Sequence, residues 1–277
     1  MNTAIEQCLE QVRQTVPLIH NITNYVTVND CANILLACGG SPIMADDEEE
    51  AAQITAVCGG LNINIGTLNK RTIASMFLAG RKANELGHPA VLDPVGAGAS
   101  DLRTDTARRL LEEIRFAVVR GNISEMKTLA AGAGTTKGVD ADMADRVTEE
   151  NLDQAVAFAK EFASRYSTVA AISGALDIVA DGERAYVIRN GHPVMAQITG
   201  SGCMLTAMTA AYVTANREHP LEAAAAAFCV MGISGERAYE RMRRENAGNA
   251  SFRTYLIDEV YKMDSQVLMR EAKYEVR

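Results

Sequence analysis

Short runs of β-branched and apolar residues alternate with longer helical patterns along most of this chain. Residues 61–65 switch strictly between apolar and polar side chains, which predicts a strand. Residues 69–86 keep a helical period until Gly87 stops it. Repeated strand–helix units of this kind predict an α/β fold, with a mainly parallel central sheet and helices on both of its faces.

A late hairpin is expected beside this parallel sheet. Asp181-Gly182 is a turn signal between two apolar runs, and it predicts antiparallel strands at the sheet edge. The expected strands are residues 16–19, 41–44, 61–65, 90–93, 116–119, 168–172, 177–180 and 185–188. Helices are expected at residues 27–38, 69–86, 104–114 and 152–166, at the acidic run 46–50, from Ser124, and through most of the chain after Gly202. No linker rich in proline or serine divides the chain, so we expect one domain over residues 1–277.

The composition excludes several classes of protein. A net charge of -8 argues against nucleic-acid binding, which needs a basic surface, but a nucleotide pocket remains compatible with it. No apolar run reaches the roughly 20 residues of a membrane span, and the N-terminus has no signal-peptide pattern. The six cysteines lack metal-site spacing, so we expect free thiols and a cytoplasmic protein.

A glycine-rich segment, residues 199–206, is the most informative local pattern. Gly200 and Gly202 allow backbone N–H groups to converge, and a helix beginning near Gly202 would point its unpaired N–H groups at the same place. Cys203 would lie in the first helical turn, where the helix dipole lowers the pKa of a thiol. This pattern predicts an oxyanion site beside a catalytic base. The alternative is an ordinary turn before a core helix, with Cys203 as packing.

Charged and amide side chains follow two of the expected strands, where ligands gather in such sheets. Arg120, Asn122 and Glu125 come after the strand at 116–119, and they suit a phosphate site. Glu125 could hold Mg²⁺, usually through water, and Asp93 at the end of another strand could be a second carboxylate. The alternatives are a helix cap for Glu125 and a turn-forming Asp-Pro for Asp93.

Polar residues 20–27 follow the first expected strand and could orient a small polar ligand. Thr23 or Asn24 could equally be an N-cap, and His20 fits a structural role better than a catalytic one. The chain has no GxxxxGK[ST] phosphate loop, no protein-kinase motif set, no GxSxG elbow and no HExxH zinc motif.

Together these motifs resemble the hydroxyethylthiazole kinase family of the ribokinase-like superfamily. The resemblance runs from about Leu18 to Tyr261, and Cys203 is this branch's mark because sugar kinases of the superfamily carry aspartate there. The matching stretches are residues 19–26, 41–45, 64–68, 93–97, 120–125 and 200–203.

The resemblance implies a three-layer αβα fold without a separate lid domain. It implies ATP- and Mg²⁺-dependent phosphorylation of the primary alcohol of 4-methyl-5-(2-hydroxyethyl)thiazole, a salvage step of thiamine biosynthesis. Family members form homotrimers with active sites at subunit contacts, and no nucleic acid or membrane is involved.

Roles for individual residues also follow from the resemblance. Catalysis would fall to Cys203 as the base, helped by Gly200 and Gly202. The thiazole alcohol would meet Met44 and Gly200, in a pocket also lined by Asn24, Val26 and Gly66. The implied ATP-binding residues are Arg120, Asn122, Ser173 and Gly174, and the implied Mg²⁺ residues are Asp93 and Glu125.

The chain departs from the family pattern at a few positions. Ser201 and Ser173 stand where threonine is common, and both keep the hydroxyl. Residues 248–252 match the family's Pro-Gly-Ser-Phe only in part. Two other functions stay open: an ADP- or ATP-dependent dehydratase of nicotinamide hydrates, expected to carry aspartate at position 203, and a non-catalytic thiazole-binding protein.

Overall fold

The computed structural model describes residues 4–131 and 146–277. Within them, the named strands form one nine-stranded sheet in the order β2-β1-β3-β4-β5-β6-β7-β8-β9. Neighbouring strands from β2 to β6 run parallel, and β7, β8 and β9 continue the sheet antiparallel. The strands are β1 (Leu18–Ile22), β2 (Ser41–Met44), β3 (Gly60–Asn64), β4 (Ala90–Asp93), β5 (Val118–Asn122), β6 (Val169–Ser173), β7 (Asp177–Ala180), β8 (Ala185–Ile188) and β9 (Tyr274–Val276).

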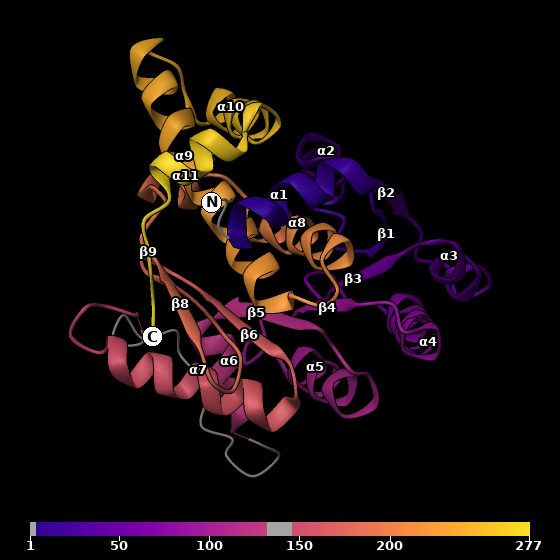
Figure 1. Cartoon of the computed structure of the whole chain (residues 1–277). Helices are drawn as coiled ribbons and strands as arrows, with labels where there is room; N and C mark the ends of the chain where they lie inside the picture. Colours follow the sequence, from indigo (N-terminus) through magenta and orange to yellow (C-terminus); the bar gives the residue numbers. More distant parts are fainter. Residues whose placement is uncertain (1–3, 132–145) are drawn as a thin grey trace.

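Helices cover both faces of this sheet (Figure 1). One face carries α1 (Ala4–Thr15), α2 (Val28–Cys38), α8 (Ser201–Ala215), α9 (Pro220–Arg244), α10 (Asn249–Lys262) and α11 (Ser265–Glu271). The other carries α3 (Ala51–Val57), α4 (Lys70–Leu86), α5 (Asp101–Glu113), α6 (Ile123–Ala130) and α7 (Leu152–Tyr166). The predicted mainly parallel α/β architecture with antiparallel edge strands is confirmed.

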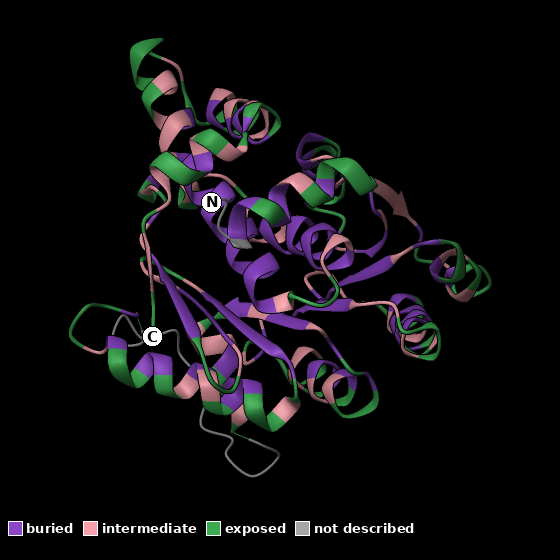
Figure 2. Cartoon of the chain, viewed as in Figure 1, coloured by how far each residue is buried: buried purple, intermediate pink, exposed green. Residues whose placement is uncertain are grey.

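Each sheet face has its own apolar core, and the purple ribbons of Figure 2 mark these buried layers. The central helix of one layer is α8, which packs on β1, β3 and β4. Its residues 204–214 are all buried, as expected of a helix that is apolar all round. The sheet and its neighbours therefore hold the first turn of α8, with Cys203, in a fixed place.

Local signals explain where several helices begin and end. Asn69 caps α4 by accepting hydrogen bonds from the backbone of Arg71 and Thr72, and Gly87 ends the helix in a left-handed conformation. Gly39 ends α2 in the same way. The stop at Gly87 and the end of α2 at Cys38 were predicted correctly.

Some boundaries differ from the prediction. The first strand begins at Leu18 rather than residue 16 and continues to Ile22. The acidic run 46–50 precedes α3 rather than opening it, because Asp47 accepts a hydrogen bond from the Glu49 N–H in a turn. The sequence prediction included neither α1 nor β9.

None of the helices in the two described ranges is both long and apolar enough to span a bilayer. That residues 1–277 form a single domain stays a prediction.

Candidate active site

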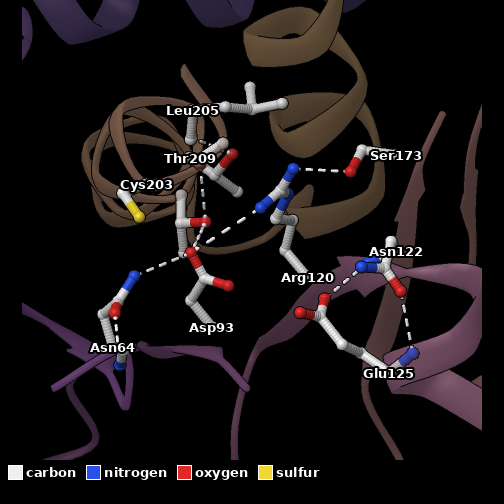
Figure 3. Close-up of polar contacts among 12 residues, drawn as sticks. Asn64, Asp93, Arg120, Asn122, Glu125, Ser173, Cys203, Leu205 and Thr209 are labelled. Atoms are coloured by element: carbon white, nitrogen blue, oxygen red, sulfur yellow. Dashed lines mark hydrogen bonds and ion pairs between the residues drawn. The ribbon is translucent and has the colours of Figure 1, made fainter. Parts of the chain in front are cut away.

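Polar side chains meet where the parallel strands end and α8 begins (Figure 3). Asp93 is the last residue of β4, Arg120 lies in β5, and Ser173 ends β6. Cys203 lies in the first turn of α8, over the same edge of the sheet. The predicted strand-end residues therefore gather in one place.

Two glycines shape the start of α8. Gly200 is its N-cap with a φ of 85°, a conformation that favours glycine, and a Cβ there would overlap the Thr27 methyl group. A Cβ on Gly202 would lie 2.6 Å from the Arg120 Nη1. The backbone at Gly202 can approach the guanidinium only because the side chain is absent.

Cys203 is the only one of the six cysteines that is not buried, and all six are free thiols. The Asn24 side chain donates a hydrogen bond from Nδ2 to the Cys203 Sγ at 3.2 Å. The expected lowering of the thiol pKa is wrong. Burial raises the pKa of Cys203 and the charge of Asp93 acts in the same direction, while the nearby polar side chains of Thr27, Asn24 and Asn64 offset only part of this.

Asp93 is fully buried. Its Oδ2 accepts hydrogen bonds from Asn64 Nδ2 at 2.9 Å and Thr206 Oγ1 at 2.8 Å, and Arg120 Nη1 lies 3.7 Å away. Burial raises the pKa of Asp93 to about 6, against the opposing effect of Arg120. Its buried Oδ1 has no hydrogen-bond partner among the described residues, so one carboxylate oxygen is left unsatisfied by the protein.

Glu125 is held by backbone N–H groups. It forms a capping box with Asn122: its Oε2 accepts from the Asn122 N–H at 2.8 Å, and Asn122 Oδ1 accepts from the Glu125 N–H at 2.8 Å. Its Oε1 accepts from the Gly96 N–H at 2.9 Å. The helix-cap alternative is therefore correct for the local structure, and the same carboxylate ties α6 to the loop after β4.

These two carboxylates fit a magnesium ion that arrives with a nucleotide. Mg²⁺ usually binds one or two carboxylates together with water and phosphate oxygens. Asp93 offers its unpaired Oδ1, and Glu125 is close enough for its charge to raise the pKa of Asp93. A cation between the two would relieve this repulsion.

Arg120 connects the carboxylate region to the next strand. Its Nη2 donates to the Ser173 Oγ at 2.5 Å. Beyond Ser173, the Gly174 N–H donates to the Asp177 Oδ1 at 2.9 Å and closes the turn before β7. Removal of its carboxyl group from water raises the pKa of Asp177 to about 7, although the residue as a whole is partly exposed.

The residues that the resemblance implies for the alcohol pocket differ in their exposure and in their surroundings. A Cβ on Gly66 would lie 3.0 Å from the Asn24 Cβ, so these two residues are in contact beside Cys203. Met44 ends β2 and is partly buried against the core. Val26 is on the surface, with 54% of its area exposed.

A cavity of about 290 Å³ opens beside Gly66. Arg103 lines it and holds two strand-end loops, donating to the Val95 carbonyl at 2.9 Å and to the Gly66 carbonyl at 2.7 Å. The other lining residues are Tyr25, Thr67, Leu68, Asn69, Ser100 and Leu102.

Several site residues were missing from the sequence prediction. Asn64 and Thr206 hold Asp93, and Arg103 joins two loops. The signal for Asn64 was an amide side chain near the end of the strand predicted at residues 61–65. His20 is buried between Thr55 and the Ala45 carbonyl, and burial lowers its pKa, which agrees with a structural role.

Comparison with known proteins agrees with the fold. A model of the Hydroxyethylthiazole kinase family matches residues 9–266. A hydroxyethylthiazole kinase of Clostridium acetobutylicum is 60% identical over 271 residues, which cover 98% of this chain and 99% of that protein.

Solved structures give the same result. A hydroxyethylthiazole kinase protein from Pyrococcus horikoshii OT3 superimposes with a TM-score of 0.88 at 37% identity, covering 99% of this chain and 98% of that one. A pyridoxal kinase from Staphylococcus aureus shares the fold alone, with a TM-score of 0.55 at 14% identity over 77% of this chain and 84% of its own. Our chain belongs to the hydroxyethylthiazole kinase family.

Proposed function

We infer that this protein is a hydroxyethylthiazole kinase. It transfers the γ-phosphoryl group of ATP to the primary alcohol of 4-methyl-5-(2-hydroxyethyl)thiazole, a salvage step of thiamine biosynthesis. The observation that carries this proposal is the placement of Cys203, at the start of α8, with the buried Asp93 carboxylate and with Arg120 beside Gly202. Phosphoryl transfer depends mainly on such positioning and on charge stabilisation.

As a thiolate, Cys203 accepts the proton of the substrate alcohol at its Sγ, after the thiol has released its own proton to solvent. Because burial raises the pKa of the thiol, the thiolate is the minor form, and hydrogen-bond donors at the sulfur increase its share. The Asn24 N–H that points at the sulfur is such a donor. The helix N-terminus, with Gly200 and Gly202, presents further N–H groups that stabilise charge on the transferring group.

Arg120 binds the ATP phosphates, and Ser173 and Gly174 hold the nucleotide on the adjacent strand end. Asn122 supports this side by capping α6. Asp93 and Glu125 would hold Mg²⁺, which neutralises phosphate charge when bound. The carboxylate of Asp93 is kept in place by Asn64 and Thr206 before any ligand arrives.

The alcohol pocket is formed by Met44, Gly200, Asn24, Val26 and Gly66. We propose that a neighbouring subunit of a homotrimer completes it. Tyr25 is 78% exposed and Val26 54% exposed beside the site, and burial of these apolar surfaces would favour such an interface.

The free thiols of all six cysteines support a cytoplasmic location.

The proposal is tested by ADP release in a coupled assay with ATP, Mg²⁺ and three acceptors: hydroxyethylthiazole, a hydroxymethylpyrimidine and ribose. We expect release with the thiazole alcohol. Release with the pyrimidine alone would assign a different acceptor. No release with any of them would favour the thiazole-binding alternative, and dehydration of a nicotinamide hydrate would favour the dehydratase, although Cys203 stands where that branch is expected to carry aspartate.

A further inference from the structure

Two asparagine side chains link the Cys203 sulfur to the Asp93 carboxylate. The Asn24 Nδ2 donates to the Cys203 Sγ at 3.2 Å and also to the Asn64 Oδ1 at 3.0 Å. The Asn64 Nδ2 in turn donates to the Asp93 Oδ2 at 2.9 Å. Asn64 is 1% exposed and Asn24 is 4% exposed, so the protein rather than water satisfies these amides.

The direction of each amide is set by groups that can only donate. The Thr27 N–H donates to the Asn24 Oδ1, so the Asn24 NH₂ must face Asn64 and the sulfur. The Gly66 N–H donates to the Asn64 Oδ1, so the Asn64 NH₂ must face Asp93. Backbone donors at two loops therefore fix the hydrogen-bond direction along the whole chain.

We propose that Asn64 is a positioning residue: it holds the Asn24 side chain so that an amide N–H points at the Cys203 sulfur, and the same side chain fixes the Asp93 Oδ2. The contribution of Asn64 to catalysis rests on the proposed function, in which Cys203 is the base. The positioning of Asn24 by Asn64 can be tested without that assumption, because the alkylation rate of the Cys203 thiol depends on the hydrogen bond from Asn24.

Asn62 provides a matched control. It lies two residues earlier in β3, so it is on the same face of the strand, and it is 0% exposed. Its Nδ2 donates to the Asn21 Oδ1 at 3.0 Å instead of reaching Cys203 or Asp93. Replacing either asparagine by serine removes a buried amide from the same strand, but only Asn64→Ser removes the support of Asn24.

The experiment measures the rate at which iodoacetamide alkylates Cys203 at pH 8, followed by mass spectrometry of the peptide. Cys203 is a selective reporter because the other five cysteines are buried. Loss of one hydrogen bond raises a thiol pKa by about one to two units, and the higher nucleophilicity offsets about half of this. We expect Asn24→Ser and Asn64→Ser each to slow alkylation by about 3- to 10-fold, and Asn62→Ser to leave it unchanged.

The double variant Asn24→Ser/Asn64→Ser tests whether Asn64 affects the Cys203 thiol through Asn24 or independently of it. If Asn64 acts through Asn24, the double variant will be no slower than Asn24→Ser alone. The proposal would be overturned if the double variant slowed alkylation by the product of the two single effects, or if Asn64→Ser kept the wild-type rate. Asn64→Thr, which suits a strand, serves the same test if Asn64→Ser does not fold. Slower alkylation with unchanged turnover would keep the positioning role but reject Cys203 as the base.

Discussion

Gly202 and Arg120 are in direct contact, and a Cβ on the glycine would lie 2.6 Å from one guanidinium nitrogen and 2.8 Å from the other. Gly202→Ala should therefore push the guanidinium away from α8. We expect the KM for ATP to rise about tenfold, the effect of roughly one lost charged hydrogen bond. Gly248→Ala is the control, because a Cβ there meets nothing within 4 Å. An unchanged KM in Gly202→Ala would mean that Arg120 does not hold the nucleotide.

Cys203→Ala should lower turnover by about 10²–10⁴-fold, the usual contribution of a general base. Binding of ATP should stay nearly unchanged, because Arg120 and Ser173 remain paired with each other. Cys203→Asp should keep substantial activity, since a carboxylate can also take the proton. The measurements are kcat in the coupled assay and ATP affinity by calorimetry. Full turnover in the alanine variant would remove Cys203 from the mechanism.

Arg103→Lys should loosen the loops after β3 and β4. Arg103 donates from two nitrogens to the Val95 and Gly66 carbonyls, and a lysine has only a single ammonium group for the two sites. We expect a loss of about 1–2 kcal/mol in the free energy of unfolding. The KM for the thiazole alcohol should increase more than the KM for ATP. Arg109→Lys, on the exposed side of the same helix, should change stability by less than about 0.5 kcal/mol. Equal effects of the two variants would contradict the loop role.

Asp177 should make stability fall as pH rises. Its pKa is raised to about 7 in the folded protein, so the folded state holds a proton that the unfolded chain loses near pH 4. The contribution of Asp177 to the free energy of unfolding is fully present below about pH 4, and it is lost as pH rises through 7. Asp177→Asn keeps an oxygen for the Gly174 N–H but does not titrate. Its Tm minus that of the wild type should be near zero at pH 4 and should grow towards pH 8. A constant difference would show that the aspartate is ionised throughout.

Chelation should stop turnover without unfolding the protein. Protein donors already hold both proposed magnesium carboxylates: Asn64 and Thr206 hold Asp93, and the N–H groups of Gly96 and Asn122 hold Glu125. EDTA in excess over Mg²⁺ should therefore abolish ADP release and leave the Tm unchanged, and added Mg²⁺ should restore activity. A fall in Tm with EDTA would point to a structural metal instead.

The sequence predicted those elements whose signals are local. The cap at Asn69 and the stop at Gly87 define α4, and both can be identified from residue type alone. The pattern of α1 was also local, with Ile5, Cys8, Leu9 and Val12 at helical spacing and all buried, so this helix could have been predicted. In contrast, β9 has only three residues and exists because β8 offers it an edge, which no local pattern shows.

The site was predictable in its parts but not in its electrostatics. Strand ends and glycines in the sequence indicated Asp93, Arg120 and Cys203. The pKa of Cys203 depends on how deeply the thiol is buried and on the nearby charge of Asp93, and both are properties of the assembled fold. Capping of α6 by Asn122 and Glu125 was visible as an N-x-x-E pattern, and the same two residues are proposed for the nucleotide and magnesium sites.

The hydrogen bond between Asn24 and Cys203 joins residues that are 179 positions apart. During synthesis, β1, β3 and β4 leave the ribosome long before α8, the helix that covers them. Until then one apolar side of these strands has no native cover, and a chain that stops short of α8 would keep it bare. We therefore expect truncated products to aggregate or to engage chaperones, rather than to persist as inactive but well-folded molecules.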